Sequence, residues 1–144
     1  NLLNIYSADR KTLFLIDPLA VYYTPLAATI SNLKISSWLT ENRLLYANDF
    51  EIYFFDLNSG EKTLITRISN AINSLYLHPS GNYLVFSTDQ SINTIELDQR
   101  EKRNITELAK FDKIVDLTMN QNGNILYFYA KIGNQEGIYK LEIQ

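Results

Sequence analysis

The segment HPSGNYLVFSTDQSINTIELDQREKRNIT, residues 78–106, decides the fold of this chain. It consists of a turn, an apolar run, a polar break, an alternating run and a charged turn. Runs of this length, bounded by Gly, Pro, Asn and Asp, predict β-strands joined by short turns. Related segments occur elsewhere in the chain, so residues 78–106 form part of one copy of a repeat.

The repeat becomes visible when the chain is aligned with itself. The matches are residues 55–66 with 95–106 at an offset of 40, residues 81–86 with 123–128 at 42, residues 42–46 with 81–85 at 39, and residues 12–17 with 51–56. In this alignment Asp17, Asp56, Glu96 and Glu142 mark one structural position in four copies.

Each copy contains short apolar runs of strand length. The copies span approximately residues 1–32, 33–71, 72–110 and 111–144, within a single segment of residues 1–144. The first copy lacks its first strand and the last ends after its third, which gives two complete and two partial copies. In the two complete copies the expected strands are 33–39, 43–47, 51–57, 62–67, 72–78, 82–87, 91–97 and 102–108.

The second strand of a copy is apolar on both faces. Residues 83–86 and 125–128 have this character, which is typical of an inner strand packed between neighbouring sheets. Four-stranded antiparallel units of about 40 residues with such a strand predict an all-β fold made of β-propeller blades. Because a propeller needs at least about four blades to close, two complete and two partial blades would form either a small, permuted ring or part of a larger propeller. We expect the larger propeller, since both ends of the repeat array look cut.

Residues 18–32 fit the repeat least well. Pro18 and Pro25 cannot donate ladder hydrogen bonds, so residues 21–24 are expected to be an edge strand or a loop. We expect an outer fourth strand followed by a crossover, with a partner-binding patch as the alternative. Tyr22 and Tyr23 would point to opposite faces of an extended segment, so one of them would meet solvent or a partner.

Composition narrows the classes of partner. The 144 residues are 46% hydrophobic and 20% charged, with a formal net charge of −3, which argues against nucleic acid as a partner. No apolar run is long enough to cross a bilayer, so we expect no membrane insertion by this segment. There is no cysteine, and therefore neither a disulfide framework nor a thiolate nucleophile.

The residues that could act in catalysis or bind a metal ion have simpler structural interpretations. His78 is the only histidine, and a lone histidine without cysteine cannot make an ordinary zinc site. The stretch Asp56–Glu61 resembles the start of a calcium loop, but a hairpin turn explains it as well. Asp49 and Glu51 could form an acid and base pair, but their spacing suits the solvated turn between two strands equally well. The sequence thus predicts no catalytic residue, no metal site and no cofactor.

The repeats resemble β-propeller repeats of the WD40-like and TolB-like kind, in which a turn such as His78-Pro79-Ser80-Gly81 precedes the second strand of a blade. The resemblance extends from about Leu2 to Ile143, without the Trp-Asp and Gly-His dipeptides of true WD40 repeats. The Asn-rich and Tyr-rich blades are also similar to bacterial propellers that follow a PEGA-type domain. That second resemblance implies an extracytoplasmic or membrane-tethered setting.

Two functions are compatible with these observations. In the first, a noncatalytic propeller scaffold binds a protein or an extended ligand through loops 47–50, 88–90 and 131–135. In the second, the chain is a lid or gating domain of a larger hydrolase-type enzyme. Possible partner-binding residues are Tyr22, Tyr23, Asp49 and Phe50. We expect the partner to be a protein or flanking blades of the same chain, and we expect exposed blade faces to allow self-association.

Overall fold

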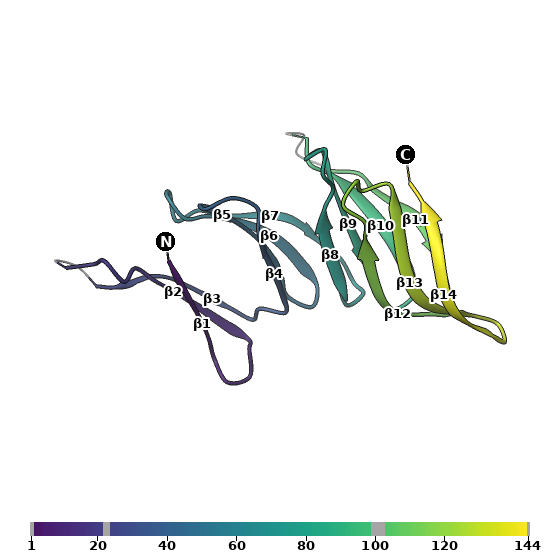
Figure 1. The fold of residues 1–144 in the computed structure, drawn as a ribbon, viewed down its shortest axis with the longest axis horizontal. Helices are drawn as coiled ribbons and strands as arrows, with labels where there is room; N and C mark the ends of the chain where they lie inside the picture. Colours follow the sequence, from purple (N-terminus) through teal and green to yellow (C-terminus); the bar gives the residue numbers. More distant parts are fainter. Residues whose placement is uncertain (1, 22–23, 99–102, 144) are drawn as a thin grey trace. The chain divides into compact units, whose positions relative to one another are not determined.

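The chain folds entirely into β-strands and connecting turns in the residues that the structure describes. A computed structural model describes residues 2–21, 24–98 and 103–143 (Figure 1). The strands form four antiparallel sheets, two of four strands and two of three. The predicted all-β fold with two complete and two partial blades is therefore confirmed. The chain forms two compact units, residues 1–64 and 65–144.

The first unit begins with a three-stranded sheet in the order β1-β2-β3, and the four-stranded sheet β4-β5-β6-β7 follows. The strand β7 continues past the end of the unit. The strands are β1 (Leu3–Tyr6), β2 (Thr12–Ile16), β3 (Leu26–Ser31), β4 (Ile35–Trp38), β5 (Arg43–Ala47), β6 (Glu51–Asp56) and β7 (Lys62–Arg67).

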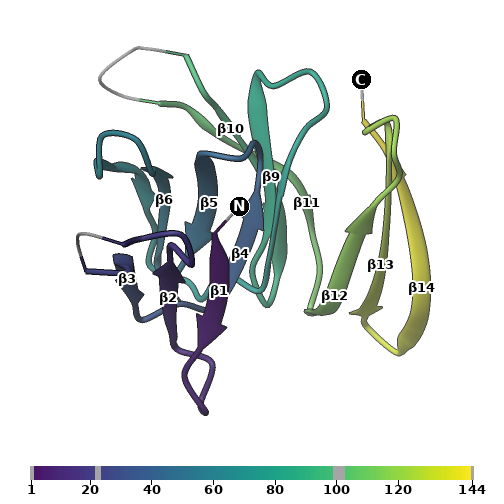
Figure 2. The same cartoon turned by 60° about the vertical axis from the view of Figure 1, so that its left-hand side comes forward.

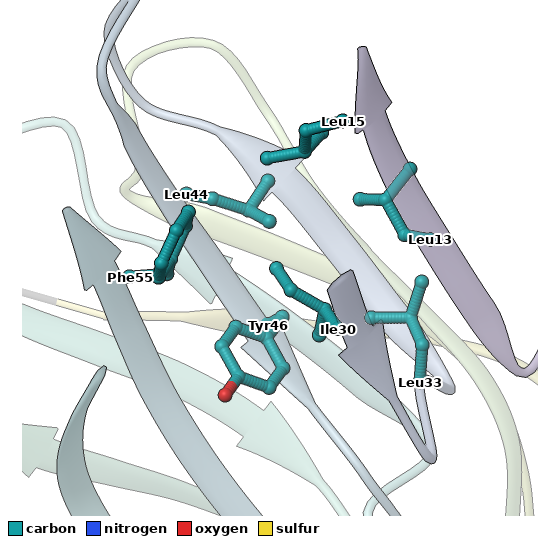
Figure 3. Close-up of a cluster of buried hydrophobic side chains, with 7 residues drawn as sticks. All are labelled: Leu13, Leu15, Ile30, Leu33, Leu44, Tyr46 and Phe55. Atoms are coloured by element: carbon teal, nitrogen blue, oxygen red, sulfur yellow. The ribbon is translucent and has the colours of Figure 1, made fainter. Parts of the chain in front are cut away.

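A hydrophobic core joins these two sheets. Leu13, Leu15 and Ile30 of the first sheet pack with residues of the second and with Leu33 of the connection between the sheets. Figure 3 shows these side chains converging, with Leu44, Tyr46 and Phe55 contributed by the second sheet. Burial raises the pKa of Tyr46 to about 12, and the nearby Tyr53 and Glu51 act in the same direction. The Tyr46 phenol therefore stays neutral to a higher pH than a tyrosine in solution.

The second unit also contains two antiparallel sheets, but the four-stranded sheet comes first. Its sheets have the orders β8-β9-β10-β11 and β12-β13-β14. Figure 2 shows β12, β13 and β14 side by side in the second of these sheets. The strands are β8 (Ser74–Leu77), β9 (Tyr83–Ser87), β10 (Ser91–Glu96), β11 (Ile105–Lys110), β12 (Lys113–Met119), β13 (Ile125–Ile132) and β14 (Gln135–Glu142).

The core of the second unit lies between its two sheets. Val85 and Ile92 of the first sheet pack with Ile114, Leu117, Leu126, Phe128 and Ala130 of the second. The hydroxyl of Tyr76 donates a hydrogen bond to the carbonyl of Leu117, at 2.8 Å, which joins the two sheets by a polar contact as well.

The described part of residues 18–32, namely 18–21 and 24–32, contains the outer strand β3. The strand β3 pairs with β2 along an antiparallel ladder, so the predicted outer fourth strand is confirmed. The amide of Asp17 donates to the carbonyl of Pro25, at 2.7 Å, and this bond closes the loop between β2 and β3. Tyr22 and Tyr23 lie outside the described residues.

The prediction of two-sided burial is right for one inner strand and wrong for the other. Leu84, Val85 and Phe86 in β9 are all buried. In β13, Leu126 and Phe128 are buried but Tyr127 is 42% exposed. The reason is that only one face of the β12–β14 sheet takes part in the core of its unit.

Strand pairing also corrects one alignment. Leu44 pairs with Phe55, and Leu84 pairs with Ile95, so Leu44 corresponds to Leu84 at an offset of 40 rather than 39. Because side chains alternate between faces, a shift of one residue exchanges the two faces of the strand.

Gly123 is required at a close contact between two turns. Its φ is +78°, and a Cβ at this position would lie 2.5 Å from both His78 Nε2 and Pro79 Cδ. Gly81 has a similar φ of +74°, but a Cβ there would meet no atom within 4 Å. Substitutions at Gly81 and Gly123 therefore distinguish the cost of a positive φ, which both positions share, from the cost of crowding, which arises only at Gly123.

We expect Gly81→Ala to lower the free energy of unfolding by about 1 kcal/mol, the cost of a left-handed backbone for an L-residue. Gly123→Ala should lower it by about 3 kcal/mol, because the turn containing His78 must also move. Chemical denaturation of the two variants measures this difference. Equal losses would show that the close approach at Gly123 is not a constraint.

Candidate functional site

A polar groove in the second unit is the best candidate for a binding site. It has a volume of about 670 Å³ and is lined by Ser69, Asn70, Ala71, Thr88, Asp89, Gln90, Asp112 and Lys113. These residues come from the connection before β8, the turn between β9 and β10, and the connection from β11 into β12. We call it the β9–β12 groove.

Backbone hydrogen bonds fix the turn of residues 88–90 against the neighbouring connection. The amide of Phe111 donates to the carbonyl of Gln90, at 2.8 Å, and the amide of Ile114 donates to the carbonyl of Asp89, at 2.5 Å. Two segments that are far apart in sequence are therefore held as one wall of the groove.

The predicted loop of residues 131–135 is attached to the same region through Asp112. The amide of Asp112 donates to the carbonyl of Lys131, at 2.9 Å. In return, Asp112 Oδ2 accepts a hydrogen bond from the amide of Gly133, at 2.6 Å. The structure thus brings together two of the three predicted loops, with Asp112 as the connecting residue that sequence reasoning missed.

A cluster of buried polar side chains stabilises the turn of residues 88–90. The Thr88 hydroxyl lies 2.9 Å from the Ser91 hydroxyl and accepts a hydrogen bond from the Ser91 amide, at 3.1 Å. Asn93 Nδ2 donates to Ser91 Oγ, at 2.8 Å. Thr88, Ser91 and Asn93 are all at least nine-tenths buried. These bonds fix the backbone positions of Asp89 and Gln90.

The groove carries two carboxylates and one ammonium group. Asp89 Oδ1 accepts a hydrogen bond from Asn73 Nδ2, at 2.6 Å, and Asp112 Oδ2 accepts the one from Gly133 described above. One carboxylate oxygen of each aspartate is therefore hydrogen-bonded within the protein. Asp89, Asp112 and Lys113 are all exposed. The groove therefore offers carboxylate oxygens and amide groups to a ligand, with an excess of negative charge.

The third predicted loop, residues 47–50, belongs to the first unit. Asn48 determines its shape, because Asn48 Oδ1 accepts hydrogen bonds from the amides of Phe50 and Glu51, at 2.8 and 2.7 Å. Asp49 forms a solvent-exposed ion pair with Lys34, at 3.0 Å, and Phe50 is 48% exposed. The predicted partner-binding role of Asp49 and Phe50 stays a prediction, as does that of Tyr22 and Tyr23.

The other residues considered from sequence have structural contacts. His78 stacks on Tyr83 with ring centroids 4.2 Å apart, and its Nδ1 lies 2.8 Å from the Ser80 hydroxyl. Asp56 Oδ1 accepts bonds from the amides of Asn58 and Ser59, in a hairpin turn. The Ser59 amide is the main reason that the pKa of Asp56 is lowered.

Within the described residues, no group of three or more His, Cys, Asp or Glu side chains is placed to hold a metal ion. A search of the same residues finds no helix that could span a membrane.

No protein-family model matches the chain. No curated protein matches it either. Similar solved structures do exist. One is the N-terminal domain of Nup159, with a TM-score of 0.62 and 13% identity over 99% of this chain and 41% of that one. Another is an auxiliary nutrient binding protein from Bacteroides thetaiotaomicron, with a TM-score of 0.53 and 13% identity over 96% of this chain and 44% of that one.

A third similar structure is a putative 6-phosphogluconolactonase from Bacteroides uniformis, with a TM-score of 0.51 and 15% identity over 95% of this chain and 49% of that one. The chain spans less than half the length of each of these structures. The neighbours have β-propeller folds, and together with the four antiparallel sheets they define this chain as a set of propeller blades.

Replacing Thr88 by Val should lower the free energy of unfolding by about 2 kcal/mol, since the buried Ser91 and Asn93 lose a partner and the turn loses its acceptor. Ser87 provides the control. Its hydroxyl is buried without a hydrogen-bond partner, so Ser87→Ala should be neutral or stabilising. Thermal unfolding measures both effects. If the Thr88→Val variant unfolds with the same free energy as the unsubstituted protein, these hydrogen bonds do not stabilise the turn that lines the groove.

Proposed function

We propose that this chain is a noncatalytic β-propeller scaffold whose β9–β12 groove binds an extended segment of a protein partner. The observation that carries this proposal is the groove itself, in which connections from three parts of the second unit meet and are hydrogen-bonded in place. Loops held on a rigid sheet scaffold are the usual place of binding residues.

The chemistry of the lining favours a polypeptide ligand. An extended peptide carries amides and carbonyls that pair with groups such as the side chains of Asn70, Thr88 and Gln90. The two aspartates outnumber the single lysine, which favours a segment containing Lys or Arg. Asp89 Oδ2 and Asp112 Oδ1 are the oxygens that would meet these cations.

Hydrogen bonds explain why we propose a scaffold and not an enzyme. The hydroxyls of Thr88 and Ser91 bond to one another, and Nδ1 of His78 is engaged by Ser80. The side chains most suited to catalysis therefore serve to hold turns. We also assign the repeats to the WD40-like or TolB-like kind, on the turn His78-Pro79-Ser80-Gly81 before β9.

The test is selection of random peptides displayed on phage against the immobilised chain. We expect the selected peptides to be rich in Lys or Arg. For one synthesised peptide, Asn70→Arg should raise the dissociation constant at least about tenfold, because the new side chain fills the groove and opposes its charge. Fluorescence polarisation measures the change.

Asn122→Arg is the matched control. Asn122 is exposed in the turn between β12 and β13, at the end of these strands away from Lys113 and Lys131, and this variant should bind normally. Equal losses in the two variants, or no selected peptide at all, would contradict a binding role for the groove.

A further inference from the structure

The two aspartates of the β9–β12 groove are each held by a hydrogen bond from within the protein. Asn73 Nδ2 donates to Asp89 Oδ1, at 2.6 Å, and the amide of Gly133 donates to Asp112 Oδ2, also at 2.6 Å. Both bonds are short, as is typical when the acceptor carries a charge. Each carboxylate is therefore turned with one oxygen toward the protein and the other toward the groove.

The two donors are themselves fixed by the sheets. Asn73 stands directly before β8, and its amide donates to the carbonyl of Ser87 at the end of β9, at 2.8 Å. Gly133 lies in the turn between β13 and β14, which the ladder pair of Ile132 and Gln135 closes. A donor held by a sheet also fixes the orientation of its acceptor. The two aspartates are therefore oriented before a ligand binds.

This orientation leaves Asp89 Oδ2 and Asp112 Oδ1 for a ligand. Among the residues that the structure describes, no donor is bonded to either of these oxygens. Lys113 is the single cation of the lining, and it forms no ion pair with a described carboxylate. The negative charge of both aspartates thus remains available to a cationic ligand.

The orientation matters because the two basic side chains of proteins bind carboxylates differently. The guanidinium group of arginine is a planar fork whose parallel N–H groups bind both oxygens of one carboxylate. The ammonium group of lysine is a compact charge with three donors, and each donor needs a single oxygen. A carboxylate that already uses one oxygen within the protein therefore favours lysine.

The rest of the groove suits an ammonium group as well. The side chains of Asn70, Thr88 and Gln90 supply neutral oxygens beside the two aspartates. Asp89 and Asp112 are exposed, so a strongly hydrated ammonium group keeps part of its water in the groove. Its three donors can be satisfied by carboxylate oxygens, neutral oxygens and water together.

We propose that the β9–β12 groove selects lysine over arginine in its ligand, and that Asn73 determines this specificity. Asn73 is not part of the lining and acts through Asp89, so it is a positioning residue. The inference rests on the proposed binding of a basic peptide segment in the groove and adds which basic residue is preferred. The selectivity comes from an acceptor that is withheld from arginine, which is discrimination against the competing ligand.

Two small probes test this preference without a defined peptide. Nα-acetyl-lysine methylamide and Nα-acetyl-arginine methylamide are titrated into the isotopically labelled chain, and the backbone amides are followed by NMR. The Gly133 amide reports on the groove because it is bonded to Asp112. We expect both probes to shift its resonance and the lysine probe to bind about fivefold more tightly. Asn70→Arg should abolish the shifts by filling the groove.

Asn73→Ala tests the cause of the preference. The substitution removes the donor to Asp89 Oδ1 and offers both oxygens of Asp89 to a guanidinium group. The arginine probe should therefore gain at least about threefold in affinity, while the lysine probe changes less. Asn73→Leu keeps the volume of the side chain and gives the same comparison if the alanine variant does not fold.

Asn82→Ala is the matched control. Asn82 is exposed in the turn between β8 and β9, at the end of β9 away from Thr88, and this variant should bind both probes as the unsubstituted chain does. Circular dichroism shows whether each variant is folded.

The outcomes distinguish this inference from the proposed function. Equal or tighter binding of the arginine probe, or a preference that both Asn73 variants leave unchanged, would overturn lysine selectivity while peptide binding stands. Absence of any shift with the lysine probe would overturn it too, and the selection of displayed peptides decides the proposed function separately. Tighter binding of the lysine probe that is lost in the Asn73 variants and kept in Asn82→Ala is the result that supports the inference.

Discussion

The structure depends on face-to-face packing between antiparallel sheets. A single sheet of three or four short strands cannot bury its own apolar side chains, so a neighbouring sheet must cover them. The third-strand positions of Leu13, Ile52 and Ile92 are fully buried, and full burial of such a side chain contributes roughly 1.5–3 kcal/mol.

The candidate binding site is a consequence of this arrangement. Ladder hydrogen bonds and core packing fix the strand ends, and the turns between the strands are then held by local polar contacts. Asp112 and the cluster of Thr88, Ser91 and Asn93 make these contacts around the β9–β12 groove. The scaffold is repetitive, whereas the residues that shape the groove differ between copies. A binding specificity would therefore reside in the turns.

The sequence predicted most of the strands, because alternating and apolar runs reflect local geometry. The limits of the prediction were set by tertiary contacts. Tyr127 has the same apolar surroundings in sequence as Val85, but only Val85 has a sheet packed over it. Loop 88–90 was predicted, whereas the groove that it lines together with residues 69–71 and 112–113 depends on segments that are distant along the chain. Asn48 could have been recognised, since Asn before a two-residue turn often accepts backbone hydrogen bonds.

The central claim, that packing between sheet faces determines stability, is tested most directly by hydrogen exchange on the chain. Both β9 and β13 have a paired strand on each side, so hydrogen bonding does not distinguish them. They differ in burial, because β9 is buried on both faces and β13 on one. The account predicts that the amides of β9 exchange more slowly than those of β13. Equal protection of the two strands would contradict it.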